Sequence, residues 1–437
     1  MNEKLMKYGV SACRMLLPKE RYLPRFAVVA CDQYTSEPDY WRQVEALVGD
    51  APSALHMVVP EIYLGQGDEK RIAATGAHMR RYMEEGVFRY LDEGVMLVER
   101  TLGDTGMIRR SVVLAVDLEA YDFHPEKKSP IRATEGTIEE RIPPRLRVRE
   151  HALLELSHIQ VLIDDPQRRV VEGLFAHTPQ LALQYDFELM QGGGRLRGWH
   201  VPEGEMLGEL AGALEGVFAP GAYRARMGVD IETGAILFAV GDGNHSLATA
   251  KAHWEKLKAT LPETELEGHP ARLAMVELLN LHDDSLVFEP IHRVVFGIAP
   301  QALLKAMREA AERRGLAMKP DAPAGEGSHV IEAYFEGDER MLVFENPVDR
   351  LPVGTLQGIL DEVLEAFPQA AIDYIHGGDV AKKLGQGSGA AAFLLPAMDK
   401  SALFPAVLHE GVLPRKTFSM GHAHEKRYYL EARLIVR

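Results

Sequence analysis

Runs of apolar residues alternate with polar, helix-like stretches along most of this chain, a pattern typical of proteins that mix helices and strands. Apolar runs predict strands at 26–31, 94–99, 107–118, 158–163, 235–240, 273–281 and 287–296. Helical periodicity predicts helices around Tyr40 and Trp41 and at 69–86, 147–156, 247–258 and 299–314. The first strand is followed by a polar turn that begins at Asp32, and Gly192–Gly194 predict a hairpin turn.

These elements predict an α/β (mixed α+β) fold in two domains, because 437 residues exceed one ordinary hydrophobic core. The polar segment 261–270 is the best internal boundary. We therefore expect an N-terminal α/β domain over 1–265 with a mixed sheet. A C-terminal α+β domain over 266–437 is expected to contribute to the same site.

Composition excludes several classes of protein. Hydrophobic residues at 46% and charged residues at 26% are typical of a globular protein, and no apolar run approaches the ~18 residues of a membrane span. The first residues lack the apolar core of a secretion signal, and Cys13 and Cys31 are too few for a disulfide scaffold. We expect a cytoplasmic protein without a membrane partner, and a net charge of −15 argues against nucleic acid.

The segment Gly241–Ser246 has four polar side chains in six residues, at the predicted change from strand to helix. Backbone N–H groups at a helix N-terminus have no partner within the helix, and this end carries partial positive charge, so it suits a phosphate or carboxylate. Asp242 could bind a divalent cation or accept a proton, and His245 could bond to phosphate or transfer a proton. The phosphate cradle would consist of Gly241, Gly243, Asn244 and Ser246.

An ordinary helix cap is the alternative interpretation of this segment, but a cap requires only one such side chain. The segment is not a Walker loop, because the Lys-Ser/Thr pair is missing. It also lacks the Gly-x-Gly-x-x-Gly spacing of dinucleotide sites.

Further candidate residues lie outside this segment. Arg132, Arg141 and Arg145 could clamp an anion, with Glu135 as a candidate base and Pro143-Pro144 stiffening the loop; a solvated charged loop is the alternative. On a strand, His292 and Arg293 would face opposite sides. Lys416 could reach a phosphate or be a plain surface lysine. His422, His424 and Glu425 suggest a metal, although His-x-His is frequent by chance among 17 histidines.

Together these motifs resemble a bacterial and archaeal family known as domain of unknown function 1015 (DUF1015). In that family a strand leads into Asp-Gly-His/Asn-His-Arg/Ser, as at Asp242–Ser246. The remaining matches are an Arg-x-Thr-Glu block with later arginines (Arg132, Thr134, Glu135, Arg141, Arg145), an aliphatic strand ending in Asp-Asp-Pro (161–166), Pro-x-His-Arg (290–293) and Pro-x-Lys-Ser/Thr (Pro414, Lys416, Thr417).

The Asp-Gly-His-His-Arg pattern is in turn similar to the phosphate-binding motif of the ParB/sulfiredoxin superfamily, which includes free-serine kinases that use ADP or ATP. The resemblance implies a ParB/sulfiredoxin-like N-terminal part in which Asp242–Ser246 grip nucleotide phosphates. This chain departs at Asn244, which replaces the first His, and at Ser246, which replaces Arg. Arg132, Arg141, Arg145 or Lys416 would have to supply the missing charge.

We therefore expect a small-molecule kinase that moves a phosphoryl group from ATP or ADP to a hydroxyl-bearing metabolite, serine-like among the candidates, with Mg²⁺. Asp242 would be the metal ligand or base. Arg132, Arg141, Arg145 and Arg293 would act as clamps, with His292 and Lys416 as further phosphate ligands. The partner is a phosphorylated small molecule, and a homodimer is the candidate assembly. The alternatives are a nucleotide or phosphoester hydrolase and a non-catalytic sensor.

Overall fold

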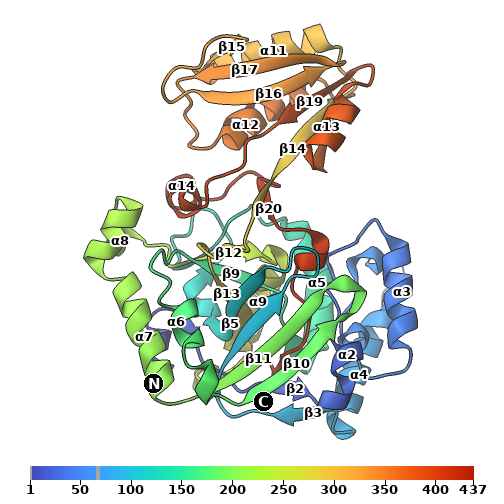
Figure 1. Ribbon diagram of the computed structural model, residues 1–437, viewed down its shortest axis with the longest axis vertical. Coiled ribbons are helices and arrows are strands. Elements are labelled where there is room, and N and C mark those ends of the chain that lie inside the picture. Colours follow the sequence, from blue (N-terminus) through green and yellow to red (C-terminus); the bar gives the residue numbers. More distant parts are fainter. Residues whose placement is uncertain (1, 65–68) are drawn as a thin grey trace. The chain divides into compact units, whose positions relative to one another are not determined.

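The computed structural model describes residues 2–64 and 69–437, which form two compact units (Figure 1). The first unit comprises the chain up to Leu286 together with Gly421–Arg437, and the second comprises Val287–Met420. The second unit is therefore an insertion in the sequence of the first. The domain division predicted at 265/266 stays a prediction.

A ten-stranded mixed sheet forms the centre of the first unit, in the order β10-β11-β4-β5-β13-β9-β12-β7-β6 with β1 beside β5. Its strands are β1 (Val10–Ser11), β4 (Gly94–Thr101), β5 (Ile108–Asp117), β6 (Tyr121–Asp122), β7 (Ile131–Ala133), β9 (Gln160–Ile163), β10 (Leu183–Leu189), β11 (Gly194–Pro202), β12 (Phe238–Asp242) and β13 (Leu273–Asn280). Strand β12 runs parallel to β7 and antiparallel to β9. This mixed sheet confirms the α/β class, whereas a ParB/sulfiredoxin-like part stays a prediction.

A four-stranded sheet in the first unit joins segments from both ends of the chain, because β21 pairs with β2 and β8. Its strands are β2 (Leu16–Pro18), β3 (Phe88–Tyr90), β8 (Leu154–Leu156) and β21 (Ala432–Leu434). The helices of the unit are α1 (Asn2–Met6), α2 (Leu23–Phe26), α3 (Pro38–Val48), α4 (Glu69–Glu84), α5 (Ile142–Glu150), α6 (Val171–Phe175), α7 (Glu205–Val217), α8 (Pro220–Met227), α9 (Asn244–Lys258) and α10 (Glu263–Leu266).

The second unit has its own seven-stranded sheet, in the order β15-β17-β16-β19-β14-β18 with β20 paired to β14. Its strands are β14 (Phe288–Phe296), β15 (Ala317–Pro320), β16 (His329–Phe335), β17 (Asp338–Glu345), β18 (Ala371–His376), β19 (Ala390–Leu394) and β20 (Phe418–Met420). Its helices are α11 (Pro300–Arg313), α12 (Pro352–Ala366), α13 (Gly378–Gly385) and α14 (Leu403–Glu410).

Two of the predicted elements are wrong. Residues 26–30 are buried, but the segment 26–31 does not form a strand: α2 ends at Phe26, and Val29 makes a single bridge to Tyr428. The predicted helix at 147–156 begins earlier, at Ile142, because Pro143 and Pro144 suit a first turn that needs no N–H donors. It also ends earlier, and β8 follows.

The other predicted strands and the helices at Tyr40, 69–86, 247–258 and 299–314 are present within a few residues. The turn predicted at Gly192–Gly194 joins the antiparallel strands β10 and β11. None of the helices within 2–64 and 69–437 is long and apolar enough to cross a membrane.

Candidate functional site

The turn between β12 and α9 requires a glycine at its centre. Gly243 has a φ of +79°, and a Cβ added there would lie 3.0 Å from the Cα of Ile159. Few L-residues adopt this backbone conformation, and a side chain would also displace the segment that precedes β9. The glycine thus lets the start of α9 lie close to the neighbouring strand.

Helix α9 begins without a side-chain cap, because its N-cap residue is Gly243. Asn244 and His245 are its first two residues, so their N–H groups have no acceptor within the helix. The N–H of Gly243 donates to Oδ1 of Asp242 over 3.0 Å. The end of α9 therefore offers donors and partial positive charge to an anion.

Three buried oxygen atoms near this turn have no hydrogen-bond partner among the described residues: Oδ2 of Asp242, Oδ1 of Asn244 and Oγ1 of Thr137. An unsatisfied buried polar atom costs about 1–3 kcal/mol, and such atoms are rare in folded proteins. The N–H of Ile138 donates to Nε2 of His245 over 3.2 Å, which ties the Thr137 loop to the first turn of α9. The unsatisfied atoms thus lie on two segments that are held together.

A buried lysine from the end of the chain lies at the same turn. Nζ of Lys426 is 3.3 Å from Oδ2 of Asp242, an ion pair without hydrogen-bond geometry, and Lys426 is only 7% exposed. A buried ammonium needs a negative partner. Lys426 therefore gives the site a fixed positive charge beside the N-terminus of α9.

Two buried arginines hold the turn that carries Lys426. Arg100 donates to the backbone carbonyls of His424, Glu425 and Lys426. Arg109 donates to the carbonyl of Glu425 and also pairs with its carboxylate, from Nη2 to Oε2 over 3.0 Å. Because these contacts fix the backbone on both sides, the position of Lys426 is set in advance of any ligand.

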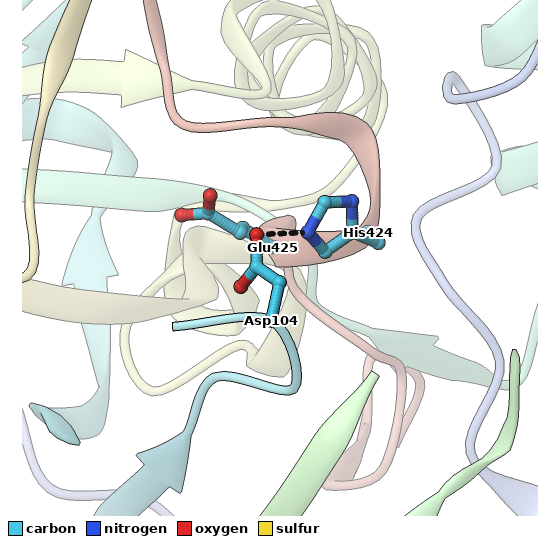
Figure 2. A group of neighbouring side chains, drawn as sticks. All are labelled: Asp104, His424 and Glu425. Carbon is cyan, nitrogen blue, oxygen red and sulfur yellow. Dashed lines mark hydrogen bonds and ion pairs between the residues drawn. The ribbon is translucent and has the colours of Figure 1, made fainter. Parts of the chain in front are cut away.

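Figure 2 shows the one group of three potential metal-ligand residues found within 2–64 and 69–437: Asp104, His424 and Glu425. Nε2 of His424 lies 2.9 Å from Oδ2 of Asp104, the contact drawn as a dashed line, while Glu425 faces Arg109. A guanidinium beside Glu425 opposes a cation there. The contacts of the His-x-His-Glu segment thus link the β4–β5 loop to the turn that carries Lys426.

A hydrogen-bonded chain runs from Ser246 into the core. Oγ of Ser246 lies 3.1 Å from Nε2 of His158, and Nδ1 of His158 lies 2.9 Å from the hydroxyl of Tyr429. That hydroxyl donates to Sγ of Cys31 over 3.0 Å. The oxygen of Tyr429 must then accept the Nδ1 proton, so neutral His158 has its Nε2 lone pair directed toward Ser246.

Asp32 completes this cluster. Its Oδ2 lies 3.8 Å from Nε2 of His158. Burial raises the pKa of Asp32, but His158, a hydrogen bond from Gln33, and Lys426 together outweigh it and hold the pKa below its usual value. An ionised Asp32 would stabilise a protonated His158. Burial also raises the pKa of Cys31 to about 12, so the thiol stays protonated.

The predicted arginines of the first unit are mostly engaged by the protein. Arg132, on β7, donates to the carbonyls of Ser129 and Gly234. Arg141 is exposed at the start of α5, and Arg145 pairs with Glu61. Glu135 is half-buried in the loop after β7.

The remaining predicted residues lie in the second unit. Arg293 is fully buried and donates to Oε1 of Gln357 and to the carbonyls of Ile291, Arg415 and Lys416. Nδ1 of His292 accepts from the N–H of Leu395, and burial followed by Arg293 lowers the pKa of His292. Lys416 itself is exposed.

The sequence prediction missed Asp32, His158, Lys426 and Tyr429. Asp32 and His158 each border an apolar run, which is where polar site residues commonly lie, so their positions gave a usable signal. Lys426 and Tyr429 gave none, because their place in the site depends on the C-terminal segment returning to the first unit.

The sequence profile of a family described as "Protein of unknown function (DUF1015)" matches residues 11–363. The chain belongs to the DUF1015 family. No curated protein matches its sequence.

Solved structures with similarity to this DUF1015 protein share little sequence with it. A free serine kinase (E30A mutant) in complex with AMP is 11% identical, with a TM-score of 0.40, covering 73% of this chain and 90% of that one. A conserved hypothetical protein from Pyrococcus furiosus is also 11% identical, with a TM-score of 0.34 and coverage of 73% and 90%. SbnI with a C-terminal truncation, from Staphylococcus aureus, is 11% identical, with a TM-score of 0.35 and coverage of 71% and 82%.

Proposed function

We propose that this protein is a phosphotransferase that moves a phosphoryl group from ATP or ADP to a small hydroxyl-bearing metabolite, serine-like among the candidates. One observation carries the proposal: the uncapped N-terminus of α9 lies beside the buried Lys426 and beside unsatisfied oxygens of Asp242 and Asn244. Such costly features are retained where a ligand completes them.

Phosphoryl transfer needs positioning and neutralisation of negative charge more than covalent help from the protein. The N–H groups of Asn244 and His245 would bind phosphate oxygens, with Gly241, Gly243 and Ser246 allowing close approach. Lys426 supplies the charge that Ser246 does not, and it does so without the arginines that are already engaged. Arg141 and Glu135 would act at the rim. Glu61 already neutralises Arg145, so the role of Arg145 as a clamp stays a prediction from the sequence. The phosphate-binding roles of Arg293, His292 and Lys416 stay predictions from the sequence.

Mg²⁺ is the proposed cofactor, and carboxylate and amide oxygens are the ligands that it prefers. Oδ2 of Asp242 and Oδ1 of Asn244 fit this role because neither accepts a hydrogen bond. The ion would neutralise phosphate charge, and Lys426 would have to yield part of its contact with Asp242. A dependence of nucleotide binding on Mg²⁺ would therefore distinguish Asp242 as a metal ligand from Asp242 as a partner of Lys426 alone.

The test combines binding with turnover. ATP and ADP, each with and without Mg²⁺, are added in a thermal-shift assay, where a ligand at 100 times its dissociation constant adds about 2.7 kcal/mol of stability. Turnover is then followed with a panel of hydroxyl-bearing metabolites, with detection of both phosphorylated product and free phosphate. Free phosphate alone would indicate a hydrolase, and binding without turnover would indicate a sensor.

Asp242→Asn is the decisive variant, and it should abolish nucleotide-dependent turnover while the protein stays folded. Asp186→Asn is the matched control, because Asp186 lies in the same unit and pairs with Arg195 near the surface. Full activity in Asp242→Asn, or no stabilisation by any nucleotide, would refute the proposal.

A further inference from the structure

A cavity of about 150 Å³ lies directly against the first turns of α9. Ser246, Thr249 and His158 line one part of it, and α5 contributes Val148. An apolar cavity of roughly 150 Å³ is large enough for a six-carbon ring. The cavity therefore offers space for a second small molecule beside the proposed phosphate cradle.

The walls of this cavity are mostly apolar. Met57, Met79, Leu154 and Met275 line it, and each is at most 2% exposed, so these walls belong to the packed core of the unit. A molecule that enters gains mainly from contact with apolar surface, and His158 with Ser246 are the polar groups beside α9 that a hydroxyl can reach.

The charged groups in the lining neutralise one another. Arg145 pairs with Glu61, and Arg149 pairs with Glu155 over 2.6 Å. Glu155 also accepts from Arg433 and from the N–H of Met275. A charged ligand would have to break one of these pairs and leave its partner uncompensated, which is costly in a buried place.

We propose, on the basis of the proposed phosphotransferase function, that this cavity binds the acceptor: an uncharged alcohol with a largely apolar carbon skeleton, up to about the size of a six-carbon ring. Its hydroxyl replaces that of Ser246 as the hydrogen-bond donor to Nε2 of His158. An acceptor of this kind excludes zwitterions such as amino acids.

The proposed step balances as follows in atoms and electrons. The hydroxyl oxygen forms a bond to the terminal phosphorus of the nucleotide, and its proton passes to Nε2 of His158. The bond between that phosphorus and the bridging oxygen breaks, and its electron pair leaves with the shortened nucleotide. Asp32, 3.8 Å from Nε2, stabilises the imidazolium that forms, while Tyr429 keeps the ring oriented through Nδ1.

The binding test uses cyclohexanol as the probe and L-serine as the charged comparison, with affinity measured by ligand-observed NMR. Wild type should bind cyclohexanol more tightly than L-serine. Val148→Trp should fill the cavity and weaken cyclohexanol binding at least tenfold without altering the nucleotide thermal shift. Arg147→Trp, on the exposed face of the same helix, is the control and should bind as wild type does. Equal binding by Val148→Trp, or binding of L-serine in preference to cyclohexanol, would overturn the inference.

The second test concerns His158 and uses cyclohexanol with ATP or ADP. His158→Gln should keep its affinity for cyclohexanol within about threefold and lose at least 100-fold in kcat for transfer to it, the size typical of lost acid–base catalysis. Two results contradict the acceptor role. One is transfer by His158→Gln at the wild-type rate, and the other is binding of cyclohexanol and nucleotide by the wild type without formation of a phosphate ester. Failure of every nucleotide to bind contradicts the proposed function instead, and leaves the measured cavity occupancy standing.

Discussion

The sequence contains two groups of charged and polar residues, one around Asp242 and the other around Arg293. The two groups differ in how many of their polar atoms form hydrogen bonds within the protein. Around Asp242 the protein leaves buried oxygens unsatisfied and a helix end uncapped. Around Arg293 the guanidinium donates to four acceptors of the protein, three of them backbone carbonyls. The two groups look alike as sequence and differ in whether the fold completes their hydrogen bonds.

This difference separates a binding role from a structural one. A guanidinium that donates to acceptors of its own chain links the middle of β14 to the 414–417 turn within the second unit. Buried acceptors without a hydrogen bond destabilise the folded protein, and a ligand that binds to them removes this destabilisation. Candidate binding sites are therefore better ranked by whether their polar atoms already have hydrogen-bond partners than by residue type.

The largest expected effect tests the structural side of this comparison. Arg293→Met should lower the free energy of unfolding of the second unit by about 3 kcal/mol. It leaves the buried carbonyl of Ile291 and Oε1 of Gln357 without this donor, and each buried acceptor without a donor costs about 1–3 kcal/mol. Urea denaturation followed by circular dichroism measures it. Arg415→Met, at an exposed position, should change stability by less than about 0.5 kcal/mol. A mild effect of Arg293→Met would place Arg293 among ligand-binding residues after all.

The next effect tests the binding side. Lys426→Met should weaken ATP or ADP binding about 10- to 100-fold, the loss expected for one charge-assisted contact of about 1.5–3 kcal/mol. Calorimetric titration of each nucleotide measures the change. Lys256→Met is the control, because Lys256 is an exposed lysine on α9 that pairs with Glu150. Unchanged nucleotide affinity in Lys426→Met would leave Lys426 as a partner of Asp242 only.

A smaller effect concerns acid stability of the first unit. Burial, aided by Arg149, lowers the pKa of His253 on α9 from 6.5 to about 4. Between these values the unfolded chain binds a proton that the folded protein refuses, so stability falls as pH decreases from about 6.5 to 4.

His253→Phe should therefore flatten the fall in melting temperature across that pH range. The exposed His151→Phe should keep the wild-type slope. Equal slopes in all three proteins would show that His253 does not govern the acid response.

The smallest effect should be a gain. Oγ1 of Thr137 is buried without a hydrogen-bond partner, so Thr137→Val removes an unsatisfied atom at nearly constant shape. Stability should rise by up to about 1 kcal/mol while nucleotide affinity falls, with both read from thermal shifts. Thr105→Val removes an exposed hydroxyl that accepts from the N–H of Met107, so it should neither raise stability nor lower nucleotide affinity. A loss of stability in Thr137→Val would mean that the hydroxyl has a structural partner.

Local sequence patterns were sufficient for the elements that place the motif. The apolar run before Gly241 and the periodicity after Ser246 gave β12 and α9 close to their observed bounds. Both signals arise from a few adjacent residues, so no knowledge of the tertiary fold is needed. The same reasoning failed at 26–31, where burial is real but the pairing partner is Tyr428, some 400 positions away.

Only some of the site residues could be predicted from the sequence. Asp242 and Asn244 carry their signal locally, whereas the partners that decide their chemistry come from other segments. Lys426 sits where it does because Arg100 and Arg109 bind the carbonyls around it, and neither contact has a local pattern. Arg132 and Arg145 show the converse: their sequence pattern suggested free charges, and the structure gives them carbonyl or carboxylate partners.

The return of Gly421–Arg437 to the first unit has a consequence for biosynthesis. A ribosome makes Asp32, His158 and Asp242 early, but Lys426 and Tyr429 emerge only after the whole inserted unit has been translated. The nascent chain therefore holds an unfinished site until the segment after the inserted unit emerges, and that segment brings the missing ammonium and phenol.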